Sequence, residues 1–390
     1  MRSLELFVGA GGLALGLGKA GFKPDAVIEW NSFACETIRR NQNMGHEEVK
    51  HWPLFEMDVK QVNYGEFQPG IELVSGGPPC QPFSLGGKHK GYNDSRDMFP
   101  EAIRAVRELQ PTCFVFENVK GLKRQTFANY LEYIRLQLTH PEMIRKADEG
   151  WHEHLGRLER HHTHTHGVND GLNYNVVIRL LNAANYGVPQ HRERLFIVGF
   201  KSGTNIKWNF PTESHSRDAL LWDQWITGDY WDRHKVATRH RPILTDQTKK
   251  RLEIIRFLGK PETAPWQTVR DGIKGLPDPE KNSAQALEFP NHEFRPGARS
   301  YPGHTGSPLD EPAKTLKAGG HGVPGGENML VRPDGSLRYF SVRESARLQT
   351  FPDDYIFHGS WTEAMRQLGN AVPVLLAESV ARKVHSLLPH

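Results

Sequence analysis

Residues 1–30, MRSLELFVGAGGLALGLGKAGFKPDAVIEW, decide the fold. They contain two short β-rich runs, Leu4–Val8 and Ala26–Ile28, with a helix-like stretch at Gly16–Gly21 between them. A strand, a helix and a second strand in this order predict parallel strands joined by a right-handed crossover. Ligands of such a sheet bind at the carboxyl ends of its strands, and the glycine-rich run 9–12 directly follows the first strand.

The same alternation continues along the first half of the chain. Further strands and one helix are predicted at Ile71–Ser75, Met98–Leu109, Cys113–Phe116, Asn175–Leu181 and Leu195–Phe200. The last two strands are joined by a connection that contains Gly187 and Pro189, which predicts a hairpin. The predicted fold class is therefore α/β, with a mainly parallel sheet that ends in an antiparallel hairpin.

A second domain is predicted to interrupt the first. After Phe200, Pro, Gly, Trp, His and Arg become frequent, and the periodic pattern fades until about Tyr339. Such a stretch is typical of an irregular, mostly-β or loop domain. A helical pattern returns at 342–348 and in a final amphipathic segment at 372–384. We therefore expect a large discontinuous domain at 1–200 and 331–390, and a smaller domain at 201–330.

Composition narrows the classes of protein. The 390 residues are 37% hydrophobic and 24% charged, as in globular proteins, and they contain no apolar run of membrane-spanning length. Three cysteines exclude a disulfide framework and fit a reducing, cytosolic setting. The net charge is only +4, but the window 231–260 holds nine Lys or Arg against three Asp or Glu, a net +6. Such a window is either a solvated surface or a site for a polyanion.

Six histidines lie between Trp151 and His166. Acidic and cysteine co-ligands are sparse in this segment, so we expect an exposed, mobile insertion. A metal site is the alternative.

The glycine run predicts a nucleotide pocket. Glycine lets the backbone turn tightly and approach a ligand, and the helix N-terminus attracts a negative group. Glu29, at the end of the second strand, can hold ribose hydroxyls. These features fit a nicotinamide dinucleotide and S-adenosylmethionine equally. Trp30, which could stack on adenine, and Asp58, which could accept from the adenine amino group, favour S-adenosylmethionine.

Cys80 is the residue with the clearest chemistry. It lies in the run 76–84, GGPPCQPFS, where three prolines and two glycines fix an unusual backbone around one thiol. A role in packing suits Cys35 and Cys113, but not this position. The next strand ends at Glu117, and a βαβ connection would place thiol and carboxyl side by side at one sheet edge.

This pair suggests methyl transfer to cytosine. Carbon 5 of cytosine is a poor nucleophile, and addition of a thiolate to carbon 6 makes an enamine with electron density at carbon 5. A carboxylic acid that a closed, apolar pocket keeps neutral can protonate ring nitrogen 3 and assist the addition. The reaction therefore needs a nucleophile and an acid, and the sequence offers both.

With these motifs in order, the chain resembles the C5-cytosine-specific DNA methyltransferase family over most of its length outside about 201–330. The matching motifs are Phe7–Gly12 with Glu29-Trp30 and Asp58, Pro78-Pro79-Cys80-Gln81, Glu117-Asn118-Val119, Gln190-His191-Arg192-Glu193-Arg194, Arg343–Pro352 and Gly369-Asn370-Ala371-Val372-Pro373. The resemblance implies a Rossmann-like S-adenosylmethionine-dependent methyltransferase sheet and a target-recognition domain at 201–330. It also implies base flipping, because a cytosine inside a duplex cannot meet Cys80.

The resemblance assigns roles to individual residues, and no metal ligands are among them. The expected catalytic residues are Cys80, Glu117, Arg192 and Arg194. The expected residues around S-adenosyl-L-methionine, or its product S-adenosyl-L-homocysteine, are Phe7, Gly9, Gly11, Gly12, Glu29, Trp30, Asp58, Val59, Pro78, Asn370, Ala371 and Val372. The expected DNA contacts are Gln81, Ser84, Lys88 and Lys90 in a loop that closes over the flipped base, and Arg239, Arg241, Lys249, Lys250 and Arg251 in the recognition domain. A plain surface loop is the alternative for 81–99.

The expected partner is double-stranded DNA, with no membrane. The chain starts almost at the cofactor motif, as bacterial and phage enzymes do, so we expect a cytoplasmic, nucleoid-associated monomer. It would act beside a separate cognate restriction endonuclease or alone, and both contexts stay open.

Three other functions remain as alternatives: methylation of transfer RNA, a catalytically inactive DNA-binding regulator, and a nicotinamide oxidoreductase. The long recognition region argues against the first, and the intact Cys80 and Glu117 argue against the second. The motif around Cys80 has no use in the third.

Overall fold

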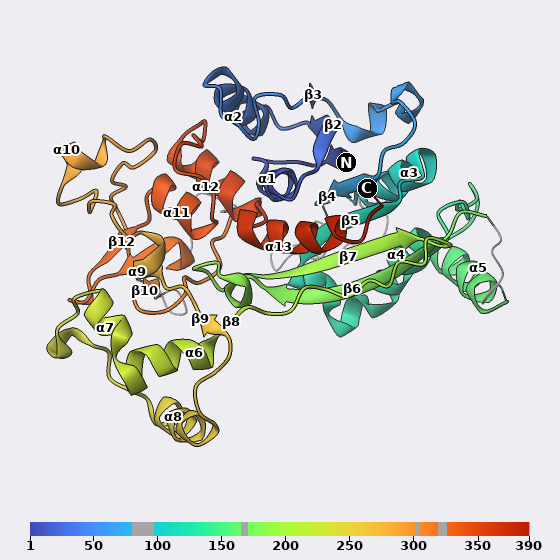
Figure 1. The fold of residues 1–390 in the computed structure, drawn as a ribbon. Coiled ribbons are helices and arrows are strands. Elements are labelled where there is room, and N and C mark those ends of the chain that lie inside the picture. The colour runs from blue at the N-terminus through green and yellow to red at the C-terminus, as the bar shows by residue number, and fades with distance from the viewer. Residues whose placement is uncertain (80–96, 165–170, 301–304, 319–325, 390) are drawn as a thin grey trace. The chain divides into compact units, whose positions relative to one another are not determined.

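The computed structural model describes residues 1–79, 97–164, 171–300, 305–318 and 326–389. These residues form two compact units, each built from segments that are separate in the chain (Figure 1). The first unit comprises Met1–Leu181, Glu193–Phe210 and Val380–His390. The second comprises Asn182–Arg192 and Pro211–Ser379.

A seven-stranded sheet organises the first unit, with the strand order β3-β2-β1-β4-β5-β7-β6. Its strands are β1 (Arg2–Leu6), β2 (Lys23–Glu29), β3 (Leu54–Glu56), β4 (Leu73–Gly76), β5 (Cys113–Val119), β6 (Tyr174–Asn182) and β7 (Glu193–Lys201). The pairs β1–β2, β1–β4, β2–β3 and β4–β5 are parallel, and β7 runs antiparallel to β5. β6 and β7 are neighbours in the sheet and consecutive in the chain, as a hairpin requires. The predicted α/β class is confirmed.

Five helices accompany this sheet in the described part of the first unit. They are α1 (Gly12–Lys19), α2 (Ser32–Asn43), α3 (Phe99–Leu109), α4 (Ala128–Thr139) and α5 (Trp151–His164). Short 3₁₀ turns lie at η1 (Val59–Gln61), η2 (Tyr64–Glu66), η4 (Lys120–Lys123) and η5 (Gln125–Phe127). The final helix, α13 (Val374–His385), begins in the second unit and ends in the first.

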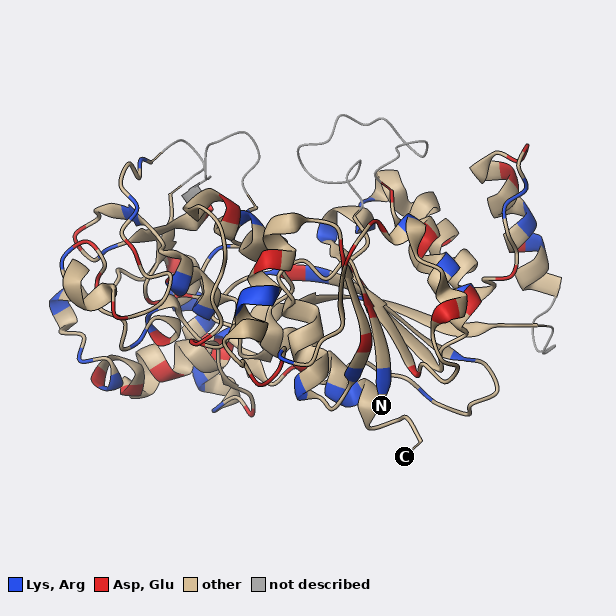
Figure 2. Cartoon of the chain, turned by 90° about the horizontal axis from the view of Figure 1, so that it is seen from above, with Lys and Arg blue, Asp and Glu red and all other residues tan. Residues whose placement is uncertain are grey.

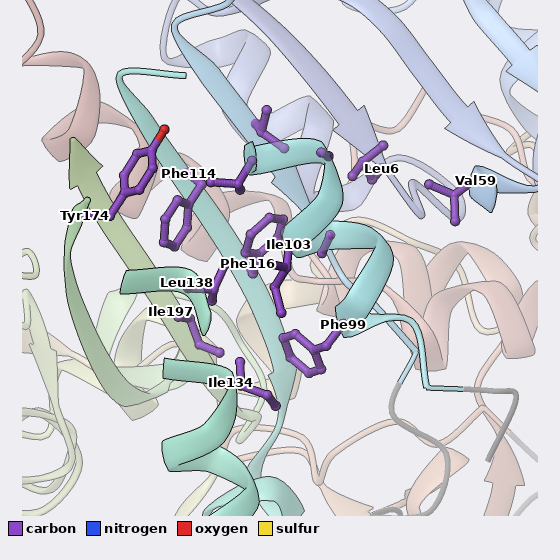
Figure 3. Close-up of a cluster of buried hydrophobic side chains, with 14 of the residues drawn as sticks. Leu6, Val59, Phe99, Ile103, Phe114, Phe116, Ile134, Leu138, Tyr174 and Ile197 are labelled. Atoms are coloured by element: carbon purple, nitrogen blue, oxygen red, sulfur yellow. The ribbon is translucent and has the colours of Figure 1, made fainter. Parts of the chain in front are cut away.

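One part of the core of the first unit lies between one face of the sheet and the helices α3 and α4. Leu6, Phe116 and Ile197, from three different strands, belong to one buried cluster with Phe99 of α3 and Ile134 of α4 (Figure 3). Burial of each such side chain contributes about 1.5–3 kcal/mol. This packing holds β5 rigidly in the sheet, and β5 carries the predicted acid at its carboxyl end.

The histidine-rich segment is the first departure from the sequence analysis. Residues 151–164 form α5, which packs against α4, so the expectation of an exposed, mobile insertion is wrong for this part. His154, Leu155 and Leu158 are buried, and the spacing 154–158 places one face of a helix against its neighbour. No group of His, Cys, Asp and Glu among the described residues could hold a metal ion.

The second unit contains more helix than strand. Its helical segments are η6 (Ala183–Tyr186), α6 (Arg217–Trp222), the π-turn η7 (Asp223–Thr227), α7 (Asp229–Arg233), η8 (Thr238–His240), α8 (Asp246–Leu258), α9 (Val269–Gly272), α10 (Ser283–Ala286), η9 (Gly326–Asn328), α11 (Val342–Leu348) and α12 (Trp361–Asn370). Its strands are β8 (His215–Ser216), β9 (Ala264–Pro265), β10 (Ser307–Pro308), β11 (Met329–Val331) and β12 (Leu337–Tyr339).

The expectation of a mostly-β domain at 201–330 is therefore wrong for the described residues. Leu252 and Ile255 of α8 are buried against Leu221 of α6. Ile254 and Phe257 on the same helix are exposed, and they mask the helical period in the sequence.

Residues 331–379 belong to the second unit, whereas the sequence analysis placed them with the sheet. The reason is that α11 packs against α9 and α12. Arg343, at the start of α11, donates to the carbonyl oxygens of Pro290, Pro352 and Tyr355. The functional division into a catalytic and a target-recognition domain stays a prediction. No helix within the described ranges is long and apolar enough to cross a membrane.

Candidate active site

The turn between β1 and α1 has an unusual backbone. Phe7, Gly9 and Gly11 have φ angles of 53°, 57° and 90°. A Cβ at Gly9 would meet no atom within 4 Å. Glycine is therefore favoured there by the positive φ and not by crowding. A positive φ at the non-glycine Phe7 costs of order 1–2 kcal/mol, and such strain concentrates at ligand sites. α1 begins after Gly11 without a side-chain cap, so its first amides point toward the turn and favour an anion there.

Glu29 ties this turn to the next strand. Its Oε2 accepts from the Gly9 amide at 2.7 Å, and its Oε1 accepts from the Trp30 and Asn31 amides at 3.0 and 2.8 Å. Trp30, directly beyond, is 72% exposed. A buried carboxylate beside an exposed aromatic ring forms a site that can take both hydroxyl donors and a flat ring.

Asp58 and Val59 follow β3, the next strand in the sheet. Asp58 is half-buried, and its Oδ1 accepts from the Lys60 amide at 3.0 Å. Val59 is buried. Three adjacent parallel strands thus end in residues that the sequence analysis assigned to one pocket, as the rule for ligand sites in α/β sheets expects.

The backbone that leads to the predicted nucleophile is held by two hydrogen bonds. Asn118 Nδ2 donates to the carbonyl oxygen of Pro78 at 2.9 Å, and the Met98 amide donates to that of Pro79 at 3.2 Å. Cys80 itself lies outside the described residues, as do the predicted DNA contacts Gln81, Ser84, Lys88 and Lys90. The described chain therefore ends, just before Cys80, in a backbone tied to β5 and to the start of α3.

Glu117 lies beside this anchored backbone. A Cβ at Gly77 would lie 3.4 Å from Glu117 Oε2, so the end of β4 passes directly along the carboxyl group. Arg194 Nε forms an ion pair with Glu117 Oε1 at 2.7 Å, and both side chains are less than a tenth exposed. Glu117 pairs with Phe196 across the strands, so Arg194 is its diagonal neighbour on the same face. Burial lowers the pKa of Arg194, and the Glu117 charge opposes this shift.

This arrangement coincides with a family match. A model described as C-5 cytosine-specific DNA methylase matches residues 1–140 and 160–386. The chain belongs to this family. The methylase transfers a methyl group from a methyl donor to cytosine in DNA.

Individual relatives agree along almost the whole methylase. The Type II methyltransferase M.Eco47II of Escherichia coli is 31% identical over 99% of this chain and 79% of its own length. M.NgoMIV of Neisseria gonorrhoeae is 32% identical over 98% of this chain and 96% of its own length. The crystal structure of the S. pombe Dnmt2 methyltransferase has the same fold, with a TM-score of 0.55, 18% identity and coverage of 100% of this chain and 98% of that one.

The remaining predicted residues of the methylase lie in the second unit. Arg192 is fully buried and donates to the carbonyl oxygens of Leu316, Gly369 and Ala371. Arg192 was predicted with Arg194 as a catalytic residue, but it lies just before β7, which begins at Glu193. Asn370 is exposed at the end of α12, and Ala371 and Val372 behind it are buried.

The predicted phosphate contacts of the methylase are accessible. Arg239, Lys249, Lys250 and Arg251 are exposed, and Arg241 is half-buried over the ring of Trp231. Arg251 pairs with Asp218, and Lys249 with Asp246. Both basic and acidic residues occur on the helices of this unit (Figure 2), so charge alone does not mark which side chains meet a phosphate.

Proposed function

We propose that the methylase transfers the methyl group of S-adenosyl-L-methionine to carbon 5 of a cytosine within a specific duplex DNA sequence, with Cys80 as the covalent nucleophile. The observation that carries this proposal is the pair Glu117–Arg194 beside the anchored backbone of Pro78 and Pro79. The predicted acid and the start of the predicted nucleophile loop lie together at one edge of the sheet. Addition to a pyrimidine needs both an acid and a nucleophile.

The chemistry follows from these groups. The Cys80 thiolate forms a bond to carbon 6, and Glu117 gives a proton to ring nitrogen 3, so electron density collects at carbon 5. Arg194 stabilises the carboxylate that Glu117 becomes in this step. S-adenosyl-L-methionine supplies an electrophilic methyl group and is converted to S-adenosyl-L-homocysteine. A base then removes the carbon 5 proton, and β-elimination expels the Cys80 thiolate while the proton on ring nitrogen 3 returns to the Glu117 carboxylate.

The other cysteines are poor candidates for this role. Burial raises the pKa of Cys35 to about 12, and it raises the pKa of Cys113 still further. Both thiols therefore stay protonated near neutral pH. A protonated thiol is a much weaker nucleophile than a thiolate.

The residues of the first unit fit the proposed methyl donor. Glu29 can accept from ribose hydroxyls, and Trp30 has an exposed ring that can stack on the adenine. The second carboxylate oxygen of Asp58 can accept from the adenine amino group. The amides at the start of α1 suit a carboxylate. Asn370, Ala371 and Val372 join the proposal through the family motif.

DNA would be bound through its phosphates and the target base extruded, since carbon 6 of a stacked cytosine is inaccessible. The relatives are named Type II methyltransferases. We therefore propose a restriction–modification role for a monomeric enzyme, with a cognate endonuclease that acts separately.

Trapping on a fluorinated substrate tests the proposal. The enzyme is mixed with duplex DNA that contains 5-fluorocytosine and with methyl-labelled S-adenosyl-L-methionine, and the products are separated under denaturing conditions. Fluorine cannot leave as a proton does, so we expect a labelled covalent enzyme–DNA band. The band should vanish in Cys80→Ala and persist in Cys35→Ala, the matched control.

Two results would overturn this function. A covalent band with fluorinated transfer RNA but not with duplex DNA would move the substrate to RNA. A band that survives in Cys80→Ala would remove Cys80 from the mechanism.

A further inference from the structure

Three chain segments of the second unit meet at the Arg192 guanidinium. Nη1 donates to the carbonyl oxygen of Leu316 at 3.0 Å, and Nη2 donates to those of Gly369 and Ala371 at 2.5 and 2.8 Å. Arg192 itself is held by its backbone, because its amide donates to Asn182 Oδ1 at 3.3 Å and its carbonyl accepts from the Ala183 amide at 2.9 Å. The side chain is fully buried, so these contacts are shielded from water.

Two side chains, Gln190 and Asn328, hold the segment around Leu316 by hydrogen bonds to its backbone. Gln190 Oε1 accepts from the Leu316 amide at 3.1 Å. Asn328 holds the next residue twice, with Oδ1 accepting from the Lys317 amide at 3.0 Å and Nδ2 donating to the Lys317 carbonyl at 3.1 Å. The side chains of Gln190 and Asn328 are both buried. Leu316 and Lys317 are therefore held by buried side chains, although they belong to no named strand or helix.

Gly369 brings the third segment into direct contact with the second. A Cβ at Gly369 would lie 2.2 Å from the Ala318 amide nitrogen and 2.4 Å from its Cα. Only glycine allows this approach. The turn that carries Asn370 and the segment that carries Ala318 therefore touch backbone to backbone, and Arg192 bridges them through its bonds to Gly369 and Leu316.

We infer that Arg192 is a positioning residue that couples the cofactor turn at 369–372 to the DNA-recognition segment at 313–318. The inference rests on the proposed function, which assigns the turn to S-adenosyl-L-methionine, and on the predicted target-recognition domain at 201–330, which contains the segment 313–318. Both segments bond to the same guanidinium, so a shift of either segment moves Arg192 and weakens its hydrogen bonds to the other. A ligand that fixes one segment therefore favours the bound position of the other.

Such coupling is reciprocal, since two ligands that share an equilibrium change each other's affinity by the same factor. Duplex DNA should tighten binding of the cofactor product, and the cofactor product should tighten binding of duplex DNA. A factor of about 5–150 is typical of coupled sites.

The test measures the affinity of S-adenosyl-L-homocysteine, by equilibrium dialysis with labelled ligand, with and without a saturating mixed-sequence linear duplex of several thousand base pairs. For the unchanged enzyme we expect tighter binding with the duplex present. Arg192→Lys keeps the charge but cannot reach three carbonyl oxygens, so the ratio of the two affinities should fall toward one. Its affinity without DNA should fall about tenfold, and saturating S-adenosyl-L-methionine should restore much of the turnover.

Two further variants separate coupling from stability. Arg343→Lys disrupts another fully buried arginine that donates to three carbonyl oxygens, so it should lower the melting temperature comparably and keep the wild-type ratio. Asn328→Ala loosens only the recognition segment, so it should lower the ratio and leave the affinity without DNA unchanged.

The outcomes are distinct. An unchanged enzyme that binds no S-adenosyl-L-homocysteine contradicts the proposed function itself. Binding that is indifferent to DNA in the unchanged enzyme overturns the coupling alone. An equal loss of the ratio in Arg192→Lys and Arg343→Lys reduces Arg192 to a general stabilising residue.

Discussion

The ion pair between Glu117 and Arg194 sets what the carboxyl group can do. The sequence suggested an apolar pocket that keeps the acid neutral, but the structure places a guanidinium 2.7 Å from the carboxylate. In a nearly closed site this contact is strong, because little water screens it. Arg194 therefore stabilises the ionised state that follows proton donation, and it fixes the direction in which the carboxyl group faces.

Glu117→Gln tests this role. The substitution keeps the shape of the side chain and removes the proton, so kcat for methyl transfer should fall about 10²–10⁴-fold, while duplex affinity changes little. It also leaves the Arg194 charge buried without a partner, which costs about 3 kcal/mol of stability. Initial rates and filter binding measure the two effects.

The matched control is Glu344→Gln, which breaks the equally buried pair Arg338–Glu344. It should cost similar stability and spare the chemistry. Equal losses of DNA binding and turnover in Glu117→Gln would make Glu117 a structural residue instead.

Sequence reasoning works for residues whose role is local. Cys80 and Glu117 stand out because their neighbours and their strand ends are visible in the chain. Asn118 is predicted only as part of a motif. Its hydrogen bond to Pro78 was not predictable, because the two residues are 40 positions apart in the chain. Arg192 was grouped with Arg194 through the family motif, and nothing local shows that its carbonyl partners lie more than 120 residues away.

At the scale of elements, buried strands were the easiest to predict. β5 is apolar through Cys113–Phe116 and buried on both faces, which produces an unbroken apolar run. Helices α5 and α8 were missed because their apolar stripes are narrow. Polar histidines dilute the stripe of α5, and exposed Ile254 and Phe257 break that of α8.

Hydrogen bonds of buried histidines hold the helix α5 to its neighbours. His154 Nδ1 faces the Tyr133 hydroxyl at 2.9 Å, and His154 Nε2 faces the Met143 carbonyl at 2.8 Å. Because a carbonyl only accepts, Nε2 carries the proton, and Nδ1 accepts from the tyrosine. Burial lowers the pKa of His154 and of His140, whose Nε2 faces His162 Nδ1 at 2.9 Å.

Acid should therefore loosen α5. The folded-state pKa of His154 is below its ordinary value, so the unfolded chain takes up the proton first as the pH falls through about 6.5. The stabilising contact is complete at neutral pH and is lost progressively below it. Hydrogen exchange of residues 151–164, corrected for the intrinsic rate, should accelerate between pH 7.5 and 5.5 relative to β5.

His154→Gln should reduce this dependence on pH, because glutamine does not titrate. The exposed His152 gives the control, and His152→Gln should behave as the unchanged chain. Identical exchange at both pH values in the unchanged enzyme would rule out the histidine contact as the cause.

At the scale of the whole molecule, the last residues complete the first unit. Val380, Ala381, Val384 and Leu388 are buried. The His385 ring meets Phe22 edge-on, with 5.4 Å between the ring centroids, and a Cβ at Gly21 would lie 3.0 Å from His385. The two ends of the chain thus pack together in one unit, with the second unit inserted between them.

Val384→Ala should therefore weaken the first unit as a whole. Loss of two methyl groups from a closed site costs on the order of 2 kcal/mol. Hydrogen exchange in β1 and β2 should accelerate, and the urea midpoint of that unit should fall. The neighbouring exposed position provides the control, since Ser386→Ala should change neither. Unaltered exchange in β1 and β2 would show that the end of α13 is dispensable for the sheet.

The placement of residues 380–388 also sets the timing of enzyme production in the cell. Ribosomes add about 5–20 residues each second. Synthesis of the 169 residues between Phe210 and Val380 therefore delays the last apolar cover of the nascent sheet by on the order of 10–30 s. During that interval the apolar surface that residues 380–388 later cover is exposed, and exposed apolar surface is what chaperones bind. Translation must pass Leu388 before the sheet can close, so a stalled or truncated product should be cleared before it can mark DNA.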